Sequence, residues 1–225
     1  LACAALSGVL VLALGRKLGG SELAARLALL LLAVYPNNAL YVPVAMTEVF
    51  YTLLLLALCW LLVVRQGTLA LVGAGLLLGV ATLVKAQTLV VVPLILGIAV
   101  LRAPKFWAAV PGAIAKGLVL AALAALVVAP WSLRNERELG HYVAVSTNGG
   151  VTLLTGNNDA ADGGYNDQDP AYTSLFAQKG RMDEIAYDAE AQRRGTAWIA
   201  ANPGRFVALM PKKLVKLWAP DGEGF

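Results

Sequence analysis

The chain has 225 residues, of which 59% are hydrophobic and 14% are charged. Soluble domains usually carry about 25% charged residues, so this composition excludes an ordinary soluble domain. Residues 1–129 carry eight basic and two acidic side chains, whereas residues 130–225 carry ten and twelve. The sequence therefore predicts an apolar, basic part and a polar, slightly acidic part, which meet at Ala129-Pro130.

The apolar part divides into blocks that we expect to be membrane helices. Inside lipid every backbone polar group has to be paired within its own segment, and a bilayer core of ~30 Å takes about 20 helical residues. The last block has this length and the others are somewhat shorter. The blocks are Leu1–Leu14, Leu23–Tyr35, Glu48–Val64, Leu69–Val84, Thr88–Leu101 and Ala108–Ala129. We predict an all-α polytopic membrane protein with about six spans.

The basic residues give these spans an orientation, because Lys and Arg favour the cytoplasmic flanks of membrane helices. When Arg16 is placed inside, six basic residues fall on inner loops and Lys85 alone falls on an outer turn. Pro36–Thr47, Lys85–Gln87 and residues 130–205 then share the outer, non-cytoplasmic face. Charged groups at the ends of different spans are therefore expected in one water layer.

Two alternatives remain for the middle of the apolar part. Leu69–Leu101 is either one long span or a hairpin with a tight turn at Lys85-Ala86-Gln87. A single span would place Arg65 and Arg102 on opposite faces of the membrane. The alternation of charge favours the hairpin.

The chain begins inside an apolar run and stops at Asp221–Phe225 without a closing element. Leu1–Leu14 has neither the basic n-region nor the cleavage site of a signal peptide. We therefore expect a fragment of a larger membrane protein. Residues 1–129 are expected to form the transmembrane region, residues 130–205 an extracytoplasmic polar domain, and residues 206–225 an interfacial amphipathic helix that leads to later spans.

Two isolated charges in the apolar part are candidate functional residues. A charge near a membrane span is costly, which makes Glu48 a candidate; the alternative is an N-terminal acid favoured by the helix dipole, with Thr47 as the N-cap. Lys85 ends a helix in which Gly75 and Gly79 predict a packing face. A lone Lys at the outer end suggests an anionic partner such as a lipid phosphate, with ordinary snorkelling as the alternative.

Arg134-Asn135 follows the expected exit helix and provides the next candidates. An Arg fork at the depth of the lipid headgroups suits a bidentate phosphate contact. The alternative is a salt bridge from Arg134 to Glu136 or Glu138.

Asn/Gly-rich segments further along provide three more candidates, Asn148, Asn157 and Asn158. Their amides suit sugar hydroxyls and pyrophosphate oxygens, while as pure pattern the glycines predict turns that flank a strand at Val151–Leu154. The polar domain is therefore expected to be small and either mixed α/β or irregular. Asp159–Asp169 holds four Asp without an EF-hand register and is interpreted as a solvated acidic loop.

The end of the chain predicts two helices. Asp183–Ala201 has the alternating charges of a soluble helix and is ended by Asn202-Pro203. The following segment places apolar residues on one face with Lys212, Lys213 and Lys216 beside it, which is the pattern of an interfacial helix. The apolar residues are Phe206, Leu209, Met210, Leu214, Leu217 and Trp218.

Several of these motifs, taken in order, resemble the bacterial family 39 glycosyltransferases. These are GT-C membrane enzymes similar to protein O-mannosyltransferases and to the aminoarabinose transferase of lipid A. The resemblance spans nearly the whole chain. The matching motifs are Thr47-Glu48, Thr82-Leu83-Val84-Lys85, Ala129–Asn135, Val145–Gly150, Gly156-Asn157-Asn158, Gly163-Gly164, Trp198-Ile199 with Asn202-Pro203 and Phe206, and Lys213 with Leu217-Trp218.

The resemblance implies inverting transfer of a sugar from a polyprenyl-phosphate donor to an acceptor on the outer face of the bacterial cytoplasmic membrane. The acceptor class is lipid A, a cell-envelope glycan or a protein. Glu48 matches the family's second acidic position, while the principal acidic residue lies in a loop that would precede this chain. The family's usual Lys-Pro is Lys85-Ala86 here, which puts the geometry of that turn in doubt.

The resemblance implies a lipid-linked sugar, membrane lipid and an acceptor as partners, and no nucleic acid. The lone His141 argues against a His-based metal site or a Ser-His-Asp triad. The metal requirement stays open, with a divalent metal as one alternative. Two other functions also stay open: a multi-span transporter or flippase in which Glu48 and Lys85 line a path, and a membrane scaffold without catalytic activity.

Overall fold

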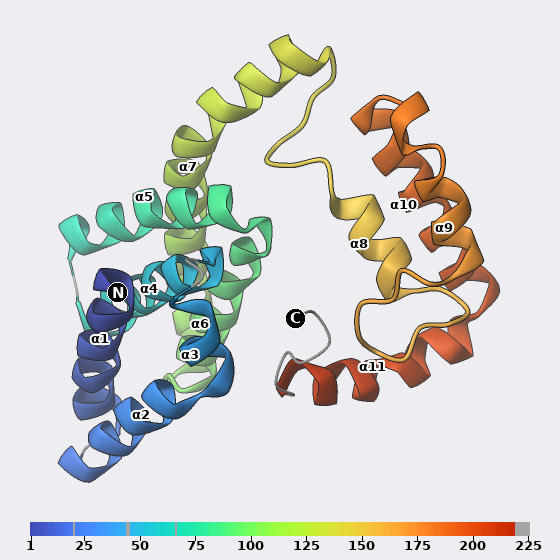
Figure 1. Ribbon diagram of the computed structural model, residues 1–225. Coiled ribbons are helices and arrows are strands. Elements are labelled where there is room, and N and C mark those ends of the chain that lie inside the picture. Colours follow the sequence, from blue (N-terminus) through green and yellow to red (C-terminus); the bar gives the residue numbers. More distant parts are fainter. Residues whose placement is uncertain (20, 44–45, 66, 219–225) are drawn as a thin grey trace. The chain divides into compact units, whose positions relative to one another are not determined.

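The computed structural model describes residues 1–19, 21–43, 46–65 and 67–218 (Figure 1), and over these ranges it is all-helical without a strand. The chain divides into two compact units, Leu1–Arg134 and Asn135–Phe225. The predicted all-α class is confirmed for the described residues. The mixed α/β alternative for the polar domain is wrong there.

Unit 1 contains six α-helices and most of a seventh, α7, among its described residues. A π-helical turn, Trp60–Val64, extends α4, and a 3₁₀ turn, Ala86–Val90, precedes α6. The helices are α1 Ala2–Leu18, α2 Glu22–Val34, α3 Pro36–Tyr41, α4 Thr47–Cys59, α5 Thr68–Val84, α6 Val91–Leu101 and α7 Phe106–Leu139.

Local chemistry explains several of the helix ends in unit 1. The Ser21 hydroxyl accepts a hydrogen bond from the Ala24 amide and so caps α2. Pro36 occupies the first turn of α3, where its missing amide hydrogen costs nothing. Lys85 has an extended backbone (φ −146°, ψ 111°) that ends α5, so Leu69–Leu101 is not one continuous helix. The predicted break in the helix at Lys85 is confirmed, and the hairpin of two membrane spans stays a prediction.

Two described helices are long and apolar enough to cross a membrane, namely α4 with its π-helical extension and α7. Only 17% and 11% of their apolar windows are buried, whereas a core helix of a soluble protein has its apolar face covered. The neighbouring helix α5 has 17 residues, fewer than the ~20 that a bilayer core takes. Two helices therefore suit a membrane, and the six spans with their orientation stay predictions.

Helix α7 does not end where the composition changes. The sequence places the exit of the chain at Ala129-Pro130, but α7 continues through Pro130 to Leu139. A proline removes one helical hydrogen bond without forcing the helix to stop. The 34 residues of α7 rise about 51 Å, which exceeds a hydrocarbon core of ~30 Å. The polar residues after Pro130 therefore extend the helix rather than begin a loop.

The predicted packing face on α5 is confirmed. A Cβ atom on Gly75 would lie 2.6 Å from the Leu123 Cβ, and one on Gly79 would lie 2.6 Å from the Val127 Cβ. Glycine is required at both positions because it lets the backbone of α5 approach α7 closely. Leu78 and Leu120 pack beside this contact and are almost completely buried.

Unit 2 consists of four α-helices and one 3₁₀ turn, Lys179–Arg181, among its described residues. The helix predicted over Asp183–Ala201 is confirmed as α10, and the predicted amphipathic helix as α11. Residues 219–225, which the sequence also assigned to that segment, lie outside the described residues. The helices are α8 Gly149–Gly156, α9 Pro170–Phe176, α10 Glu184–Ala201 and α11 Pro203–Trp218.

The strand predicted at Val151–Leu154 is wrong, because these residues belong to α8. Packing of these residues on α10 favours the helix over the strand. A Cβ on Gly150 would collide with the carbonyl oxygen of Asp188, so the two backbones are in direct contact. The Asp188 carboxylate also accepts a hydrogen bond from the Val151 amide (3.0 Å) and satisfies one free amide at the start of α8. Leu154 is then buried in the core of unit 2.

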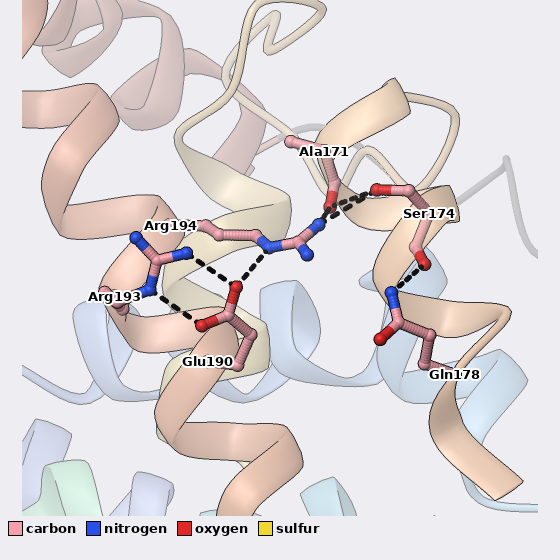
Figure 2. A network of polar contacts seen from close by, with 6 residues as sticks. All are labelled: Ala171, Ser174, Gln178, Glu190, Arg193 and Arg194. Atoms are coloured by element: carbon pink, nitrogen blue, oxygen red, sulfur yellow. Dashed lines mark hydrogen bonds and ion pairs between the residues drawn. The ribbon is translucent and has the colours of Figure 1, made fainter. Parts of the chain in front are cut away.

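A charge network fastens α10 to α9 (Figure 2). The Glu190 carboxylate binds both Arg193 (2.7 Å) and Arg194 (2.8 Å). The Arg194 guanidinium donates to the Ala171 carbonyl oxygen (2.7 Å) and to the Ser174 hydroxyl (2.9 Å). Hydrogen bonds from Arg193 and then Arg194 lower the pKa of Glu190 to about 2. The network therefore depends on an ionised Glu190.

We predict that Gly150→Ala destabilises unit 2 by about 1–3 kcal/mol, because the added methyl group overpacks the contact with α10. The matched control is Gly149→Ala, since a Cβ on Gly149 meets no atom within 4 Å. Urea unfolding of the protein in detergent micelles, followed by near-ultraviolet circular dichroism, measures both variants. Equal losses of stability in the two variants would contradict the proposed contact.

A second prediction concerns pH. The pKa of Glu190 is lowered from 4.5 to about 2 in the folded protein, so its stabilising contribution is complete above 4.5 and is lost as pH falls towards 2. The difference in urea midpoint between the protein and Glu190→Gln should be largest above pH 4.5 and should shrink towards pH 2. A difference that stays constant with pH would show that the charge of Glu190 does not hold α9.

Candidate functional site

The predicted site residues fall into two groups that belong to different units. Glu48 and Lys85 come together in unit 1, in what we call the Glu48–Lys85 cluster with Tyr51 and Thr88. Asn135, Asn148, Asn157 and Asn158 belong to unit 2. Arg134 also belongs to unit 1, so three of the seven predicted residues lie in unit 1 and four in unit 2.

The Glu48–Lys85 cluster closes the open end of the hairpin formed by α4 and α5. The connection between the two helices lies at the other end, after Val64, so the first turn of α4 and the end of α5 are neighbours. The Lys85 Nζ donates to Glu48 Oε1 at 2.6 Å. Glu48 lies in the first turn of α4 and Lys85 directly after the last turn of α5, so each charge faces the helix end that its sign favours.

Two side chains that sequence reasoning missed complete the cluster. The Thr88 hydroxyl is buried and lies within hydrogen-bonding distance of the Tyr51 hydroxyl (3.0 Å) and of the Lys85 carbonyl oxygen (2.6 Å). The Lys85 ammonium lies 5.9 Å from the centre of the Tyr51 ring, in cation–π range. The spacing could have revealed them, since Tyr51 and Thr88 follow Glu48 and Lys85 by three residues each.

The cluster is partly open to solvent. The side chain of Lys85 is 26% exposed and that of Glu48 is 35% exposed. An ammonium group has three donors, so Lys85 can bind an anion while it keeps its bond to Glu48. The carboxylate has free lone pairs that can accept a hydrogen bond from a hydroxyl group. The pair can therefore bind a phosphate and a hydroxyl side by side.

An apolar groove lies between α5, α6 and α7, and one of its lining residues directly follows a residue of the cluster. Its volume is about 570 Å³, and its lining is almost wholly hydrocarbon. Leu89, the residue after Thr88, lies on its wall. A groove of this size suits part of a hydrocarbon chain. Further lining residues are Leu78, Val92, Pro93, Leu96, Phe106 and Ile114.

Arg134 and Asn135 end up with different neighbours. The Arg134 guanidinium lies 5.3 Å from the centre of the Trp131 ring, one turn earlier on α7. Asn135 is buried, and its amide donates to the Val143 carbonyl oxygen at 3.2 Å. Asn135 therefore fixes the segment that follows α7.

Asn157 and Asn158 have their side-chain groups engaged within unit 2. The Asn158 side chain is 1% exposed, donates to the carbonyl oxygens of Leu154 (3.0 Å) and Asn166 (3.2 Å), and accepts from the Ala160 amide (3.0 Å). Asn157 donates to a carbonyl of α8 and accepts from Lys213 (2.9 Å). These contacts fix the end of α8, where the sequence predicted contacts with substrate.

Asn148 has more freedom. It is exposed and accepts a hydrogen bond from the Ser146 hydroxyl at 2.7 Å. Among the predicted Asn residues, its amide is the least constrained by the described contacts.

The acidic loop Asp159–Asp169 is anchored rather than freely solvated. Asp159 accepts from the Trp198 indole (2.9 Å) and binds Arg205 (2.7 Å), and these contacts lower its pKa, the indole contributing most. Asp162 binds Lys216 at 3.2 Å. The Gly164 amide and then Lys216 lower the pKa of Asp162. The Asp159 and Asp162 side chains remain 73% and 57% exposed, as expected for a solvated loop, and the contacts with α10 and α11 add anchoring that the sequence did not predict.

Within the described part of the chain, no three His, Cys, Asp or Glu side chains come together in a group that could hold a metal ion. The Asp159 carboxylate is instead bound to Trp198 and Arg205, and the Asp162 carboxylate to Lys216. A requirement for a divalent metal therefore stays an open prediction.

No family model matches the chain, and comparisons with curated proteins and with solved structures give no match either. The resemblance to family 39 glycosyltransferases therefore stays a prediction from the sequence motifs. The function has to be argued from the chemistry of the Glu48–Lys85 cluster and its surroundings.

We predict that Asn158→Ala destabilises the end of α8 by about 1–3 kcal/mol, because it removes the hydrogen bonds that the buried side chain donates to the Leu154 and Asn166 carbonyl oxygens and accepts from the Ala160 amide. Asn148→Ala is the control, since the Asn148 side chain is exposed, and it should change stability little. Hydrogen–deuterium exchange of residues 150–170 measures the effect. Unchanged protection in Asn158→Ala would show that this amide has no structural role.

Proposed function

We propose that the chain belongs to a membrane glycosyltransferase that moves a sugar from a polyprenyl-phosphate donor to an acceptor hydroxyl outside the cytoplasmic membrane. The observation that carries the proposal is the Glu48–Lys85 ion pair, 2.6 Å long, at the end of two apolar helices. It combines a group for phosphate with a group for a hydroxyl at the edge of an apolar unit. Those are the chemical needs of this reaction.

In the proposed reaction the acceptor oxygen attacks the anomeric carbon of the sugar. The bond from that carbon to the phosphate oxygen breaks, and its electron pair remains on the phosphate. The acceptor proton passes to a carboxylate base. Negative charge grows on the leaving phosphate, so a fixed ammonium such as Lys85 stabilises the transition state more than the ground state. Glu48 orients the acceptor hydroxyl by accepting its hydrogen bond.

The surroundings of the cluster support a lipid-linked donor. The groove between α5, α6 and α7 offers an apolar environment for part of the polyprenyl chain, and Leu89 connects its wall to the 3₁₀ turn that carries Thr88. The proposed location is a multi-pass arrangement in a bacterial cytoplasmic membrane, with residues 130–205 on the outer face. The charge alternation of the sequence and the membrane-suited helices α4 and α7 support it.

We predict that Glu48→Gln and Lys85→Met each lower transfer by roughly 10²-fold or more, because each removes one polar group from the reacting centre. The full-length protein in nanodiscs is incubated with a radiolabelled polyprenyl-phosphate sugar and an envelope extract as the source of acceptors. Covalent transfer is then counted. The matched control is Glu22→Gln, which breaks another ion pair of unit 1, between Glu22 and Arg16.

The exchanged variant Glu48→Lys/Lys85→Glu separates a structural role from a functional one. It keeps an ion pair across the hairpin but reverses the two groups. Restored transfer would mean that the pair only holds the helices together. Full activity in both single variants would contradict the proposed role of Glu48 and Lys85 in sugar transfer. Movement of the labelled lipid across the bilayer without covalent transfer would indicate the flippase instead.

A further inference from the structure

Helix α11 uses one side to pack against the rest of unit 2. Leu209 is buried, and the basic side chains of this side bind the loop that follows α8. Arg205 binds Asp159, Lys213 donates to Asn157, and Lys216 binds Asp162. The contacts span three turns, so α11 cannot roll about its axis without breaking several of them at once.

The opposite side of α11 is an exposed apolar stripe. Val207 is 65% exposed, Leu214 63% and Leu217 71%, with Met210 between them. These residues follow one another at intervals of three and four, which places them on one helical face. Because the basic side of α11 is held by the loop, the stripe is directed away from the core of unit 2.

The charge on α11 indicates what covers the stripe. The helix contains four basic residues and no acidic residue, and the carboxylates of Asp159 and Asp162 balance two of them. Lysines are depleted in the cores of protein interfaces but common on the polar side of helices that lie on membranes. The chain also contains two helices suited to crossing a bilayer, which would bring α11 to the same membrane.

We propose that α11 docks unit 2 on the surface of an anionic lipid leaflet. The stripe Val207, Met210, Leu214 and Leu217 enters the boundary between headgroups and acyl chains, and Lys212, an exposed lysine outside the three loop contacts, lies in the negative surface potential. The loop acts as a clamp that keeps the stripe turned towards the lipid. This docking goes beyond sugar transfer and does not depend on it.

The test places an environment-sensitive fluorophore on α11 of the full-length protein in nanodiscs, with Cys3→Ala and Cys59→Ala as the background. One probe is attached at Leu214→Cys on the stripe, and the matched probe at Lys212→Cys on the polar side. Nanodiscs contain phosphatidylglycerol or phosphatidylcholine, each with or without brominated acyl chains. The blue shift of the emission and its quenching by bromine are measured.

We expect the probe at residue 214 to be blue-shifted and quenched at least two-fold more than the probe at residue 212, and more in phosphatidylglycerol than in phosphatidylcholine. Lys212→Gln, which leaves the loop contacts in place, should reduce that preference for the anionic lipid. Equal quenching at the two positions overturns the proposal, and so does a preference that this substitution leaves unchanged. A blue shift without quenching also overturns it, because a protein surface then covers the stripe.

The Glu48→Gln variant separates this inference from the proposed function. It should lose transfer but keep the quenching pattern at residue 214. Loss of quenching in a transfer-competent protein would overturn the docking alone, and retained quenching in a protein without transferase activity would leave only the docking in place.

Discussion

The ion pair between Glu48 and Lys85 sets the geometry of the open end of the α4–α5 hairpin. An unpaired charge at the edge of an apolar unit would be costly, and pairing removes much of that cost. The pair holds the start of α4 at the end of α5, while the extended backbone of Lys85 turns the chain towards α6. The Thr88 hydroxyl also contacts the Lys85 carbonyl oxygen, and the Tyr51 ring lies in cation–π range of the Lys85 ammonium. The candidate site therefore also holds the start of α4 against the end of α5.

Close backbone contacts at glycine recur in both units. In unit 1, Gly75 and Gly79 let α5 lie directly on α7, and in unit 2, Gly150 lets α8 lie directly on α10. Helices that meet in this way exclude larger side chains from the contact and fix their relative position. The same residue type thus serves an apolar helix pair and a helix pair in a polar unit.

The all-helical class, the turn at Lys85 and the contact face of Gly75 and Gly79 could be predicted from hydropathy, charge and spacing. The charge pattern predicted that Glu48 and Lys85 lie on the same face, but not that the two side chains form an ion pair. The strand at Val151–Leu154 failed because contact with α10 outweighs the local turn preference of Asn and Gly. The anchoring of Asp159 involves Trp198 and Arg205, about 40 residues away, and no local pattern reveals such a pair.

Pro130 has a mechanical consequence for α7. Its nitrogen carries no hydrogen, so the Leu126 carbonyl lacks the donor that an uninterrupted helix would supply four residues later. Bending at this point breaks fewer helical hydrogen bonds than bending in a stretch of α7 without proline, and a second proline, Pro111, lies near the start of the helix. The position coincides with the change from apolar to polar sequence. A long helix thus contains a point of easier bending where its sequence changes from apolar to polar.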